Sequence, residues 1–400
     1  LVPVRSSARV ARRECVRSIR LDTLSTIATR ATRGRPKSVV QMSTRRLVLP
    51  LRRALVRHLS SASKPAARDP TRHRLPLPSF DTHVTFTREG PRLSEARHVL
   101  CMWHGAPGST FDWRYVAPCL GPEVAIIRLE LPGHGESPRG AALDADPTSA
   151  NMEGAVLASI RGVAEAEGWD AKQPLNVFAL AHSLGSLEAL GLCDPAAELE
   201  QRTSSDIPVR FVGCGLVSPF GLRPHRAIKV IAKRDDGETF PLLRPILRSA
   251  ALEAVLRPIF RFLSVNVMGF GGRASASELF WMIKRAAASD YGRVRAIYGR
   301  MRDARTPLLL CFGTEDELME RAIHDEVAEH LSMPIREVVA TGQDGGGGSG
   351  DAGNGADEGA TQRAVVFVGA SHYAIRSHPQ QLAEVIEEWM DAVRTANLPT

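Results

Sequence analysis

The 400-residue sequence predicts an α/β fold built on a doubly wound, mostly parallel β-sheet. Two observations carry this prediction. From about residue 80, short apolar runs alternate with stretches of helical periodicity, as expected for repeated βαβ units. Most of these runs are continuously apolar, which is typical of strands that helices cover on both faces.

Seven runs are predicted as strands. The first, HVTFT, alternates polar and apolar residues and is expected at a sheet edge, whereas the second, HVLCMW, is apolar throughout. In chain order the predicted strands are 83–87, 98–103, 124–131, 174–181, 209–218, 307–313 and 364–370. The predicted helices among them are 111–120, 150–168, 184–197, 319–331 and 378–394.

Two segments interrupt the alternation. Residues 222–304 are basic and mainly helical in pattern, without a convincing strand. They are predicted to form a helical cap between two parts of the core, 80–221 and 305–395. Residues 342–362 are rich in Gly and in acidic side chains, a composition that cannot bury a core, and are predicted to be a disordered surface insertion.

The first 68 residues differ in composition from the rest of the chain. They contain 17 Lys and Arg and two acidic residues, a formal charge of +15, whereas the remaining residues carry −8. The high isoelectric point therefore belongs to this leader and is no argument for nucleic-acid binding. The sequence also lacks the zinc-finger, RRM and KH patterns that would support such binding.

The leader has the composition of a transit peptide. From Met42 onward, leucines at i, i+4 and i+8 share one helical face among arginines, and small hydroxyl residues follow. We interpret Met42 as the physiological start, residues 1–41 as upstream sequence, and residues 59–61 as the region of cleavage on import into mitochondria. The alternative is a basic tail without targeting function on a cytoplasmic protein.

Neither a structural metal nor a cofactor is expected. Of six cysteines, Cys15 lies in the leader, and the others are scattered without a C-x-x-C pair or a His cluster at ligand spacing, as is typical of reduced thiols. The sequence has no phosphate-binding loop and no dinucleotide-binding fingerprint. It also lacks the ~18 uncharged apolar residues in a row of a membrane-spanning helix.

The motif AHSLGS at 181–186 is the first candidate for chemistry. It directly follows a predicted buried strand and precedes a helical pattern. Ala181 and Gly185, on either side of Ser183, are small enough for a sharp strand–turn–helix corner. There the hydroxyl stands at a helix N-terminus, which favours developing negative charge. Ser183 is therefore the predicted nucleophile, although a Ser among small residues is by itself more often a helix cap.

A nucleophilic Ser needs a base, and the base needs an orienting carboxylate. His372 follows the last predicted strand, and Glu315, Asp316 and Glu317 follow the strand at 307–313. His372 is the predicted general base and Asp316 its acid, with Glu315 and Glu317 as the competing acids. The loop after the preceding strand, SPFGLRPH, holds no carboxylate.

Two other histidines have structural interpretations. His182, next to the nucleophile, is expected to pack at the corner rather than to act as a base. His378 precedes Pro379 and is expected to open the last helix.

Two loops complete the predicted site. HGAPGS at 104–109 follows an early strand, and its Gly105 allows a close backbone approach. The amides of Ala106 and Leu184 are the predicted pair of oxyanion-hole donors. LPGHGES at 131–137 is interpreted as a structural turn beneath the site.

The motifs HGAPGS, LPGHGES, AHSLGS, FGTEDEL and GASHY occur in the order and spacing of the α/β-hydrolase superfamily. The chain resembles its capped Ser-His-Asp branch over roughly residues 80–395. The resemblance implies an α/β-hydrolase fold with a helical cap inserted after the sixth strand. It also favours Asp316, because the family's acid usually falls third after a strand-ending glycine, and it tolerates Ala181 where the family usually has Gly.

The resemblance implies a serine hydrolase that cleaves a carboxylic ester or thioester through an acyl-enzyme, without a cofactor. A Ser nucleophile argues against haloalkane dehalogenase and epoxide hydrolase chemistry, which resembles an Asp-dependent pathway. The alternatives are acyl transfer or C–C bond hydrolysis by the same triad, and ligand binding without turnover. The expected partner is a small acyl substrate. It would be lipid-like if the apolar, Arg-containing stretch 240–263 lines an acyl channel with a basic rim.

Overall fold

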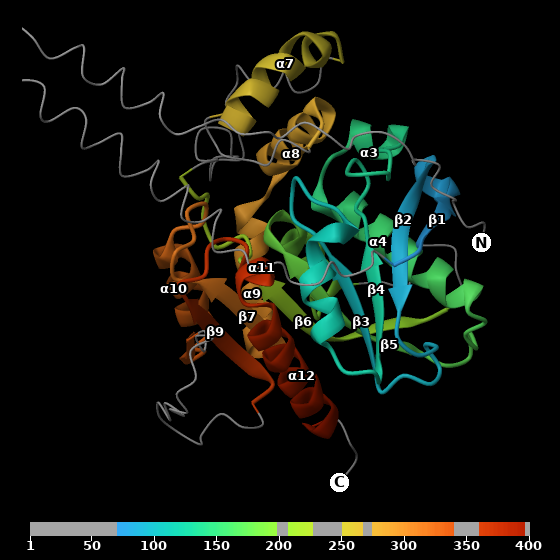
Figure 1. Ribbon diagram of the computed structural model, residues 1–400, viewed down its shortest axis with the longest axis vertical. Coiled ribbons are helices and arrows are strands. Elements are labelled where there is room, and N and C mark those ends of the chain that lie inside the picture. Colours follow the sequence, from blue (N-terminus) through green and yellow to red (C-terminus); the bar gives the residue numbers. More distant parts are fainter. Residues whose placement is uncertain (1–69, 198–206, 227–249, 267–273, 340–359, 397–400) are drawn as a thin grey trace, which may run out of the picture. The chain divides into compact units, whose positions relative to one another are not determined.

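A computed structural model describes residues 70–197, 207–226, 250–266, 274–339 and 360–396. The described residues form a nine-stranded sheet in the order β1-β2-β4-β3-β5-β6-β7-β9-β8 (Figure 1). The strands are β1 (Arg72–Leu77), β2 (Thr82–Glu89), β3 (His98–Trp103), β4 (Val124–Leu129), β5 (Leu175–His182), β6 (Val209–Val217), β7 (Leu308–Gly313), β8 (Ile335–Val339) and β9 (Gln362–Val368). The predicted α/β fold with a mostly parallel sheet is confirmed.

The direction of the strands explains why distant motifs meet. All pairings from β4 across to β8 are parallel, and only β1 with β2 and β2 with β4 pair in antiparallel fashion. In a parallel sheet the carboxyl ends of the strands share one edge. The loops after β3, β5, β7 and β9, which carry the motifs, therefore lie at that common edge.

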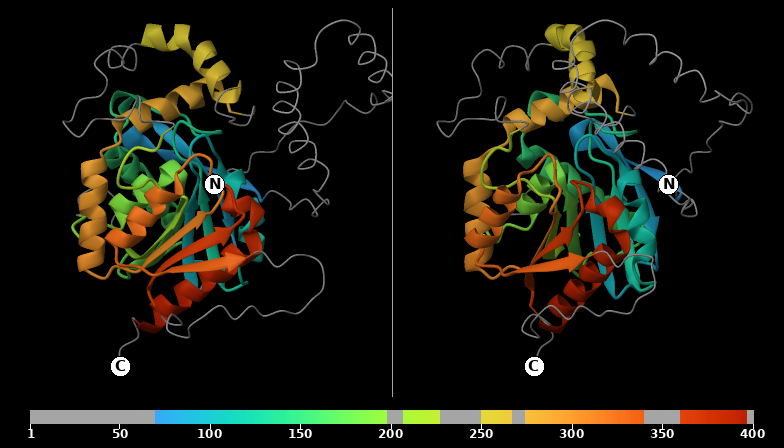
Figure 2. Two further views of the ribbon diagram at one scale, coloured as in Figure 1. Left: turned by 90° about the vertical axis from the view of Figure 1, so that its left-hand side faces the viewer. Right: turned by 60° about the vertical axis from the view of Figure 1, so that its left-hand side comes forward.

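Helices cover both faces of the sheet (Figures 1 and 2). Successive side chains of β3 point to opposite faces, so that Cys101 and Trp103 join one apolar core while Leu100 and Met102 join the other. The first core also contains side chains of α4 (Ser149–Ala166), α5 (Ser186–Leu192) and α10 (Arg321–His330). The second contains side chains of α12 (Pro379–Ala396). Burial on both faces accounts for the continuous apolar runs in the sequence.

Three local predictions were wrong. The helix predicted at 111–120 is a pair of 3₁₀ helices, η2 (Thr110–Tyr115) and η3 (Ala117–Cys119), because Pro118 has no amide hydrogen to continue an α-helix. The strand predicted for the edge, β2, pairs on both sides. The sheet begins at Arg72, ahead of the predicted start at residue 80.

The two strands that were not predicted, β1 and β8, are the edge strands of the sheet. β1 has the sequence RHRLPL and pairs only with β2, and β8 has the sequence IREVV and pairs only with β9. An edge strand tolerates Pro and polar side chains because one of its sides needs no sheet hydrogen bonds. These two strands therefore lack the apolar pattern that marks the buried ones.

The range predicted as a cap contains three described helices, α7 (Ala250–Asn266), α8 (Ala276–Ala288) and α9 (Tyr291–Asp303). α7 packs against α8 and lies on its outer side, away from the sheet (Figure 2). α9 instead packs against α5, and its apolar side chains belong to the same core as those of α5. The last helix in the range 222–304, α9, therefore belongs to the layer of helices that covers the sheet.

Several predictions concern residues outside the described ranges. These are the leader, with Met42 and the cleavage region at 59–61, and most of the Gly-rich insertion. Gln362 is the first residue of β9 and pairs with Leu308, so the insertion ends before its predicted boundary at 362. None of the described helices is long and apolar enough to cross a membrane.

Candidate active site

Ser183 stands at the turn between β5 and α5, where the 3₁₀ helix η4 (Ser183–Gly185) begins. Its φ is +51°, a left-handed conformation that is uncommon for a residue with a side chain. The small neighbours are required by packing, since a Cβ on Gly185 would lie 2.5 Å from the carbonyl oxygen of His104. The predicted strand–turn–helix corner is therefore present, and it holds the hydroxyl at the common edge of the sheet.

The structure brings the side chains of Ser183, His372 and Asp316 into one hydrogen-bonded chain. The distance from His372 Nε2 to Ser183 Oγ is 2.9 Å, and the distance from His372 Nδ1 to Asp316 Oδ2 is 2.8 Å. Nδ1–H then donates to the carboxylate, which leaves Nε2 to accept the proton of the serine hydroxyl. In the sequence, Ser183 and Asp316 lie 189 and 56 residues before His372. The neighbouring positions of β5, β6, β7 and β9 in the sheet bring them together.

Of the three acids after β7, Asp316 is the one that contacts His372. Its side chain is 1% exposed, whereas Glu315 and Glu317 are exposed residues. The second carboxylate oxygen, Oδ1, accepts hydrogen bonds from the amides of Leu318 and Met319 at 2.9 and 2.8 Å. The loop amides therefore hold one carboxylate oxygen, and His372 contacts the other.

The electrostatics of Asp316 suit a carboxylate that stays ionised. Burial by itself would raise its pKa, but the hydrogen bond and positive charge of His372, together with the Met319 amide, outweigh burial and leave the pKa below its usual value. A negative Asp316 stabilises an imidazolium when His372 gains a proton.

His182 is positioned by a contact that removes it from proton transfer. Its Nε2–H donates to the carbonyl oxygen of His372 at 3.0 Å, and the two rings lie 5.0 Å apart. Burial, followed by the nearby charge of His372, lowers the pKa of His182 to about 3. His182 is therefore neutral near pH 7 and supports the backbone of His372.

The loop after β3 lies directly against Ser183. A Cβ on Gly105 would come within 2.6 Å of the Ser183 Cβ, so only glycine allows this approach. Ala106 follows, and its amide donates no hydrogen bond to any group in the described parts of the chain. The Leu184 amide is in the first turn of η4, where N–H groups have no partner within the helix. Of the two predicted oxyanion donors, Leu184 directly follows Ser183, and Ala106 directly follows the glycine that packs against it.

Gly105→Ala is expected to slow the reaction of Ser183 with a fluorophosphonate by roughly 10²-fold, because the new methyl group must displace either the loop or the serine by a fraction of an ångström or more. The rate of labelling of the folded variant measures this effect. Gly299→Ala is the matched control, since its Cβ would meet nothing closer than 3.8 Å. An unchanged rate in Gly105→Ala would show that the loop is not held against the serine.

The turn at 131–137 is held by a buried carboxylate, that of Glu130, which follows β4. Its Oε1 accepts from the Glu136 amide at 2.5 Å and its Oε2 from the Thr110 amide at 3.4 Å. Gly133 and Gly135 have φ of +86° and +54°, values that glycine adopts without strain. This turn supports the loops around it, as its interpretation as a structural element requires.

Glu130→Gln is expected to change the pH dependence of stability. Burial raises the Glu130 pKa from 4.5 to about 7, against the opposing effects of the Glu136 amide and Arg72. A carboxyl whose pKa is higher in the folded state binds its proton more tightly there, so stability falls as pH rises from about 4.5 to 7. In the unsubstituted protein, the free energy of unfolding should therefore fall by on the order of 3 kcal/mol between pH 5 and pH 8 because of Glu130, and this fall should be absent in Glu130→Gln.

The control for this measurement is Glu95→Gln, because Glu95 is exposed and should leave the pH profile of unfolding as it is. If Glu130→Gln had the same pH profile as the unsubstituted protein, the buried carboxyl would not be the titrating group.

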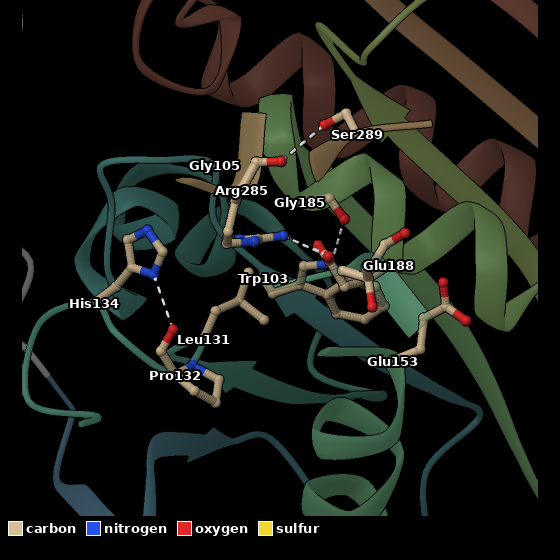
Figure 3. A network of polar contacts seen from close by, with 12 residues as sticks. Trp103, Gly105, Leu131, Pro132, His134, Glu153, Gly185, Glu188, Arg285 and Ser289 are labelled. Atoms are coloured by element: carbon tan, nitrogen blue, oxygen red, sulfur yellow. Dashed lines mark hydrogen bonds and ion pairs between the residues drawn. The ribbon is translucent and has the colours of Figure 1, made fainter. Parts of the chain in front are cut away.

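A buried ion pair lies beneath the serine corner (Figure 3). Arg285 of α8 contacts Glu188 of α5, and their side chains are 2% and 0% exposed. The indole N–H of Trp103 donates to the carbonyl oxygen of Gly185 at 2.7 Å, beside this pair. Burial raises the Glu188 pKa to about 7 even though the charge of Arg285 opposes the shift. α8 is thereby tied to α5, the helix that follows Ser183.

His324 of α10 is a site neighbour that the sequence analysis did not single out. It is 0% exposed and stacks on Phe312 of β7 at 4.7 Å. Burial lowers its pKa to about 4; the nearby charge of Asp316 opposes this shift, and His372 adds to it. In the sequence, residue 324 shares the apolar face of its helix with Val327 and Ala328, which was the available signal for burial.

Comparisons with known proteins agree with this fold. A model of the alpha/beta hydrolase family matches residues 99–385, and no curated protein matches the sequence. Haloalkane dehalogenase DbeA from Bradyrhizobium elkani is 17% identical, with a TM-score of 0.52 over 82% of this chain and 100% of that one. A provisionally assigned lipase from Acinetobacter baumannii is 16% identical, with a TM-score of 0.50 over 82% and 92%. At such identities the likeness to solved structures shows the fold alone.

Proposed function

The chain belongs to the alpha/beta hydrolase family, and on that premise we propose that it is a serine hydrolase that cleaves a carboxylic ester or thioester. The observation that carries the proposal is the hydrogen-bonded chain from Ser183 through His372 to Asp316, with its distances of 2.9 and 2.8 Å. A serine hydroxyl becomes a useful nucleophile when an oriented base accepts its proton. Here His372 is that base, and Asp316 is the acid that orients it.

The proposed reaction begins with attack of Ser183 Oγ on the carbonyl carbon of the substrate while His372 Nε2 takes the hydroxyl proton. The amides of Ala106 and Leu184 donate to the oxyanion that forms, and Asp316 stabilises the imidazolium. His372 then gives its proton to the departing alcohol or thiol. This leaves an acyl group on Ser183.

Water completes the cycle. His372 accepts a proton from the water as it attacks the acyl-enzyme, and returns that proton to Ser183 Oγ when the carboxylic acid is released. The proton transfers use Ser183, His372 and Asp316, whose side chains lie within hydrogen-bonding distance of one another, and the proposed cycle uses no cofactor.

The identity of the nucleophile favours this reaction over another one known on the same fold. DbeA, to which the chain is similar in fold, is a haloalkane dehalogenase, whereas this chain has Ser183 at its strand–helix corner, paired with a base at 2.9 Å. Serine with a neighbouring base and amide donors is suited to acyl transfer.

Hydrolysis of a panel of ester and thioester substrates of increasing acyl length, followed over many turnovers, tests the proposal. The expected result is repeated turnover by the full chain, lost in Ser183→Ala. A single stoichiometric burst without further turnover would favour the ligand-binding alternative. Product formation that requires an added alcohol would favour acyl transfer. Both results would overturn hydrolysis as the main activity.

A further inference from the structure

α7 has an apolar face that is exposed. Val255, Ile259 and Phe262 have exposed fractions of 67%, 53% and 62%. Elsewhere in the described parts of the chain only Val339 and Tyr373 are large, apolar and exposed. The concentration of such side chains on one helix distinguishes it from ordinary surface, where they occur singly. These three side chains belong to the stretch 240–263 and are exposed to solvent.

The exposed residues share one face of the helix. At about 100° per residue, positions 255, 259 and 262 fall within a sector about 60° wide. Other sides of the helix hold it in place: Glu253, 5% exposed, accepts a hydrogen bond from Arg139 at 3.0 Å, and Leu256 packs against the apolar core. α7 is thus held by contacts to the rest of the protein, and its side chains at 255, 259 and 262 are exposed to solvent.

The range that contains this face has a net positive charge. Arg261 is also exposed, and at about 100° per residue it lies about 100° around the helix from Phe262, the nearer edge of the apolar sector. Residues 222–304 as a whole contain 16 Lys and Arg and seven acidic residues, a formal charge of +9. The other residues after residue 68 contain 18 Lys and Arg and 35 acidic residues, a formal charge of −17. The sequence therefore concentrates positive charge in the range that contains the exposed apolar helix.

We propose that α7 is a docking helix for an anionic phospholipid surface. The side chains of Val255, Ile259 and Phe262 enter the boundary between headgroups and acyl chains, and Arg261 contacts the headgroups. An apolar helix face with flanking basic residues gains apolar burial and electrostatic attraction together at such a surface. The proposal concerns an interaction surface and does not depend on chemistry at Ser183.

The test must report on one position, because the basic leader would itself attract the chain to anionic vesicles. Phe262→Cys in the full chain carries an environment-sensitive fluorophore, and Ile259→Cys, one turn away, provides a second position. Val339→Cys is the matched control, since Val339 is 66% exposed and lies on β8 at the sheet edge. The unsubstituted chain, labelled in the same way, gives the background of the native thiols.

With vesicles of phosphatidylcholine and phosphatidylserine, the probes at 259 and 262 should shift to the blue and be quenched by acyl-chain spin labels. The probe at 339 should do neither, and phosphatidylcholine alone should give a much weaker response. Equal responses at 262 and 339, or none at 259 and 262, would overturn the proposal. A blue shift that grows with protein concentration without vesicles would assign the face to a second copy of the chain and would also overturn it.

Discussion

Ser183→Ala is expected to lower turnover of an ester substrate by a factor on the order of 10⁶, and His372→Ala by a similar factor. The two groups act as a unit, because the hydroxyl reacts only while the imidazole at 2.9 Å accepts its proton. The double variant should therefore be hardly worse than either single one. The measurement is steady-state turnover of the best substrate in the panel, with thermal unfolding to establish that each variant is folded.

Asp316→Asn should fall between these variants and the unsubstituted protein, with a loss of about 10⁴-fold. The amide can still occupy the space of the carboxylate but cannot stabilise the imidazolium or fix the tautomer of His372. Glu315→Gln and Glu317→Gln are the matched controls, because both residues are exposed on the same loop, and they should leave turnover unchanged. If Glu315→Gln or Glu317→Gln removed activity while Asp316→Asn did not, the assignment of the acid would be wrong.

Arg285→Met is expected to lower the free energy of unfolding by about 3–5 kcal/mol near neutral pH, because it leaves the buried carboxylate of Glu188 without its partner. The loss should be smaller at pH 5 than at pH 8. Glu188 already has a pKa raised to about 7. Without the arginine its pKa should rise further, so at pH 5 the group is protonated and costs less to bury. Denaturant unfolding at the two pH values measures the difference.

The double variant Glu188→Met with Arg285→Met is the control for this pair. Replacing both charges by apolar groups removes the buried charge together with its partner, so most of the lost stability should return. The pH dependence introduced by the single variant should also disappear. A double variant as unstable as Arg285→Met would mean that packing by the arginine side chain, rather than an unpaired carboxylate, causes the loss.

The buried part of the fold could be predicted from the sequence because it depends on patterns along the chain. β3, β5, β7 and β9 are covered on both faces, so their apolar runs are visible in the sequence, and the motif loops follow directly from them. The edge strands β1 and β8 depend on a single neighbouring strand and tolerate polar residues. Their pattern therefore does not differ from that of a loop.

Likewise, some residues of the candidate site could be predicted from the sequence and others could not. Ser183 and His372 each follow a strand in a short, distinctive motif, so their place in the chain singled them out. Asp316 was preferred to Glu315 and Glu317 because of the family resemblance. Glu188 and Arg285 are 97 residues apart, and neither lies in a motif. Their pairing depends on how α8 docks on α5, which only the three-dimensional structure supplies. The outward direction of the apolar residues of α7 is likewise a property of packing.

The most direct test of the account is to treat the full folded chain with a fluorophosphonate and to locate the adduct by peptide mass spectrometry. The reagent forms a bond to a serine oxygen only where a base removes the proton and donors stabilise the developing charge. One adduct is expected, on Ser183, formed rapidly and lost in His372→Ala. An adduct on another residue, or none on a protein shown to be folded, would contradict it.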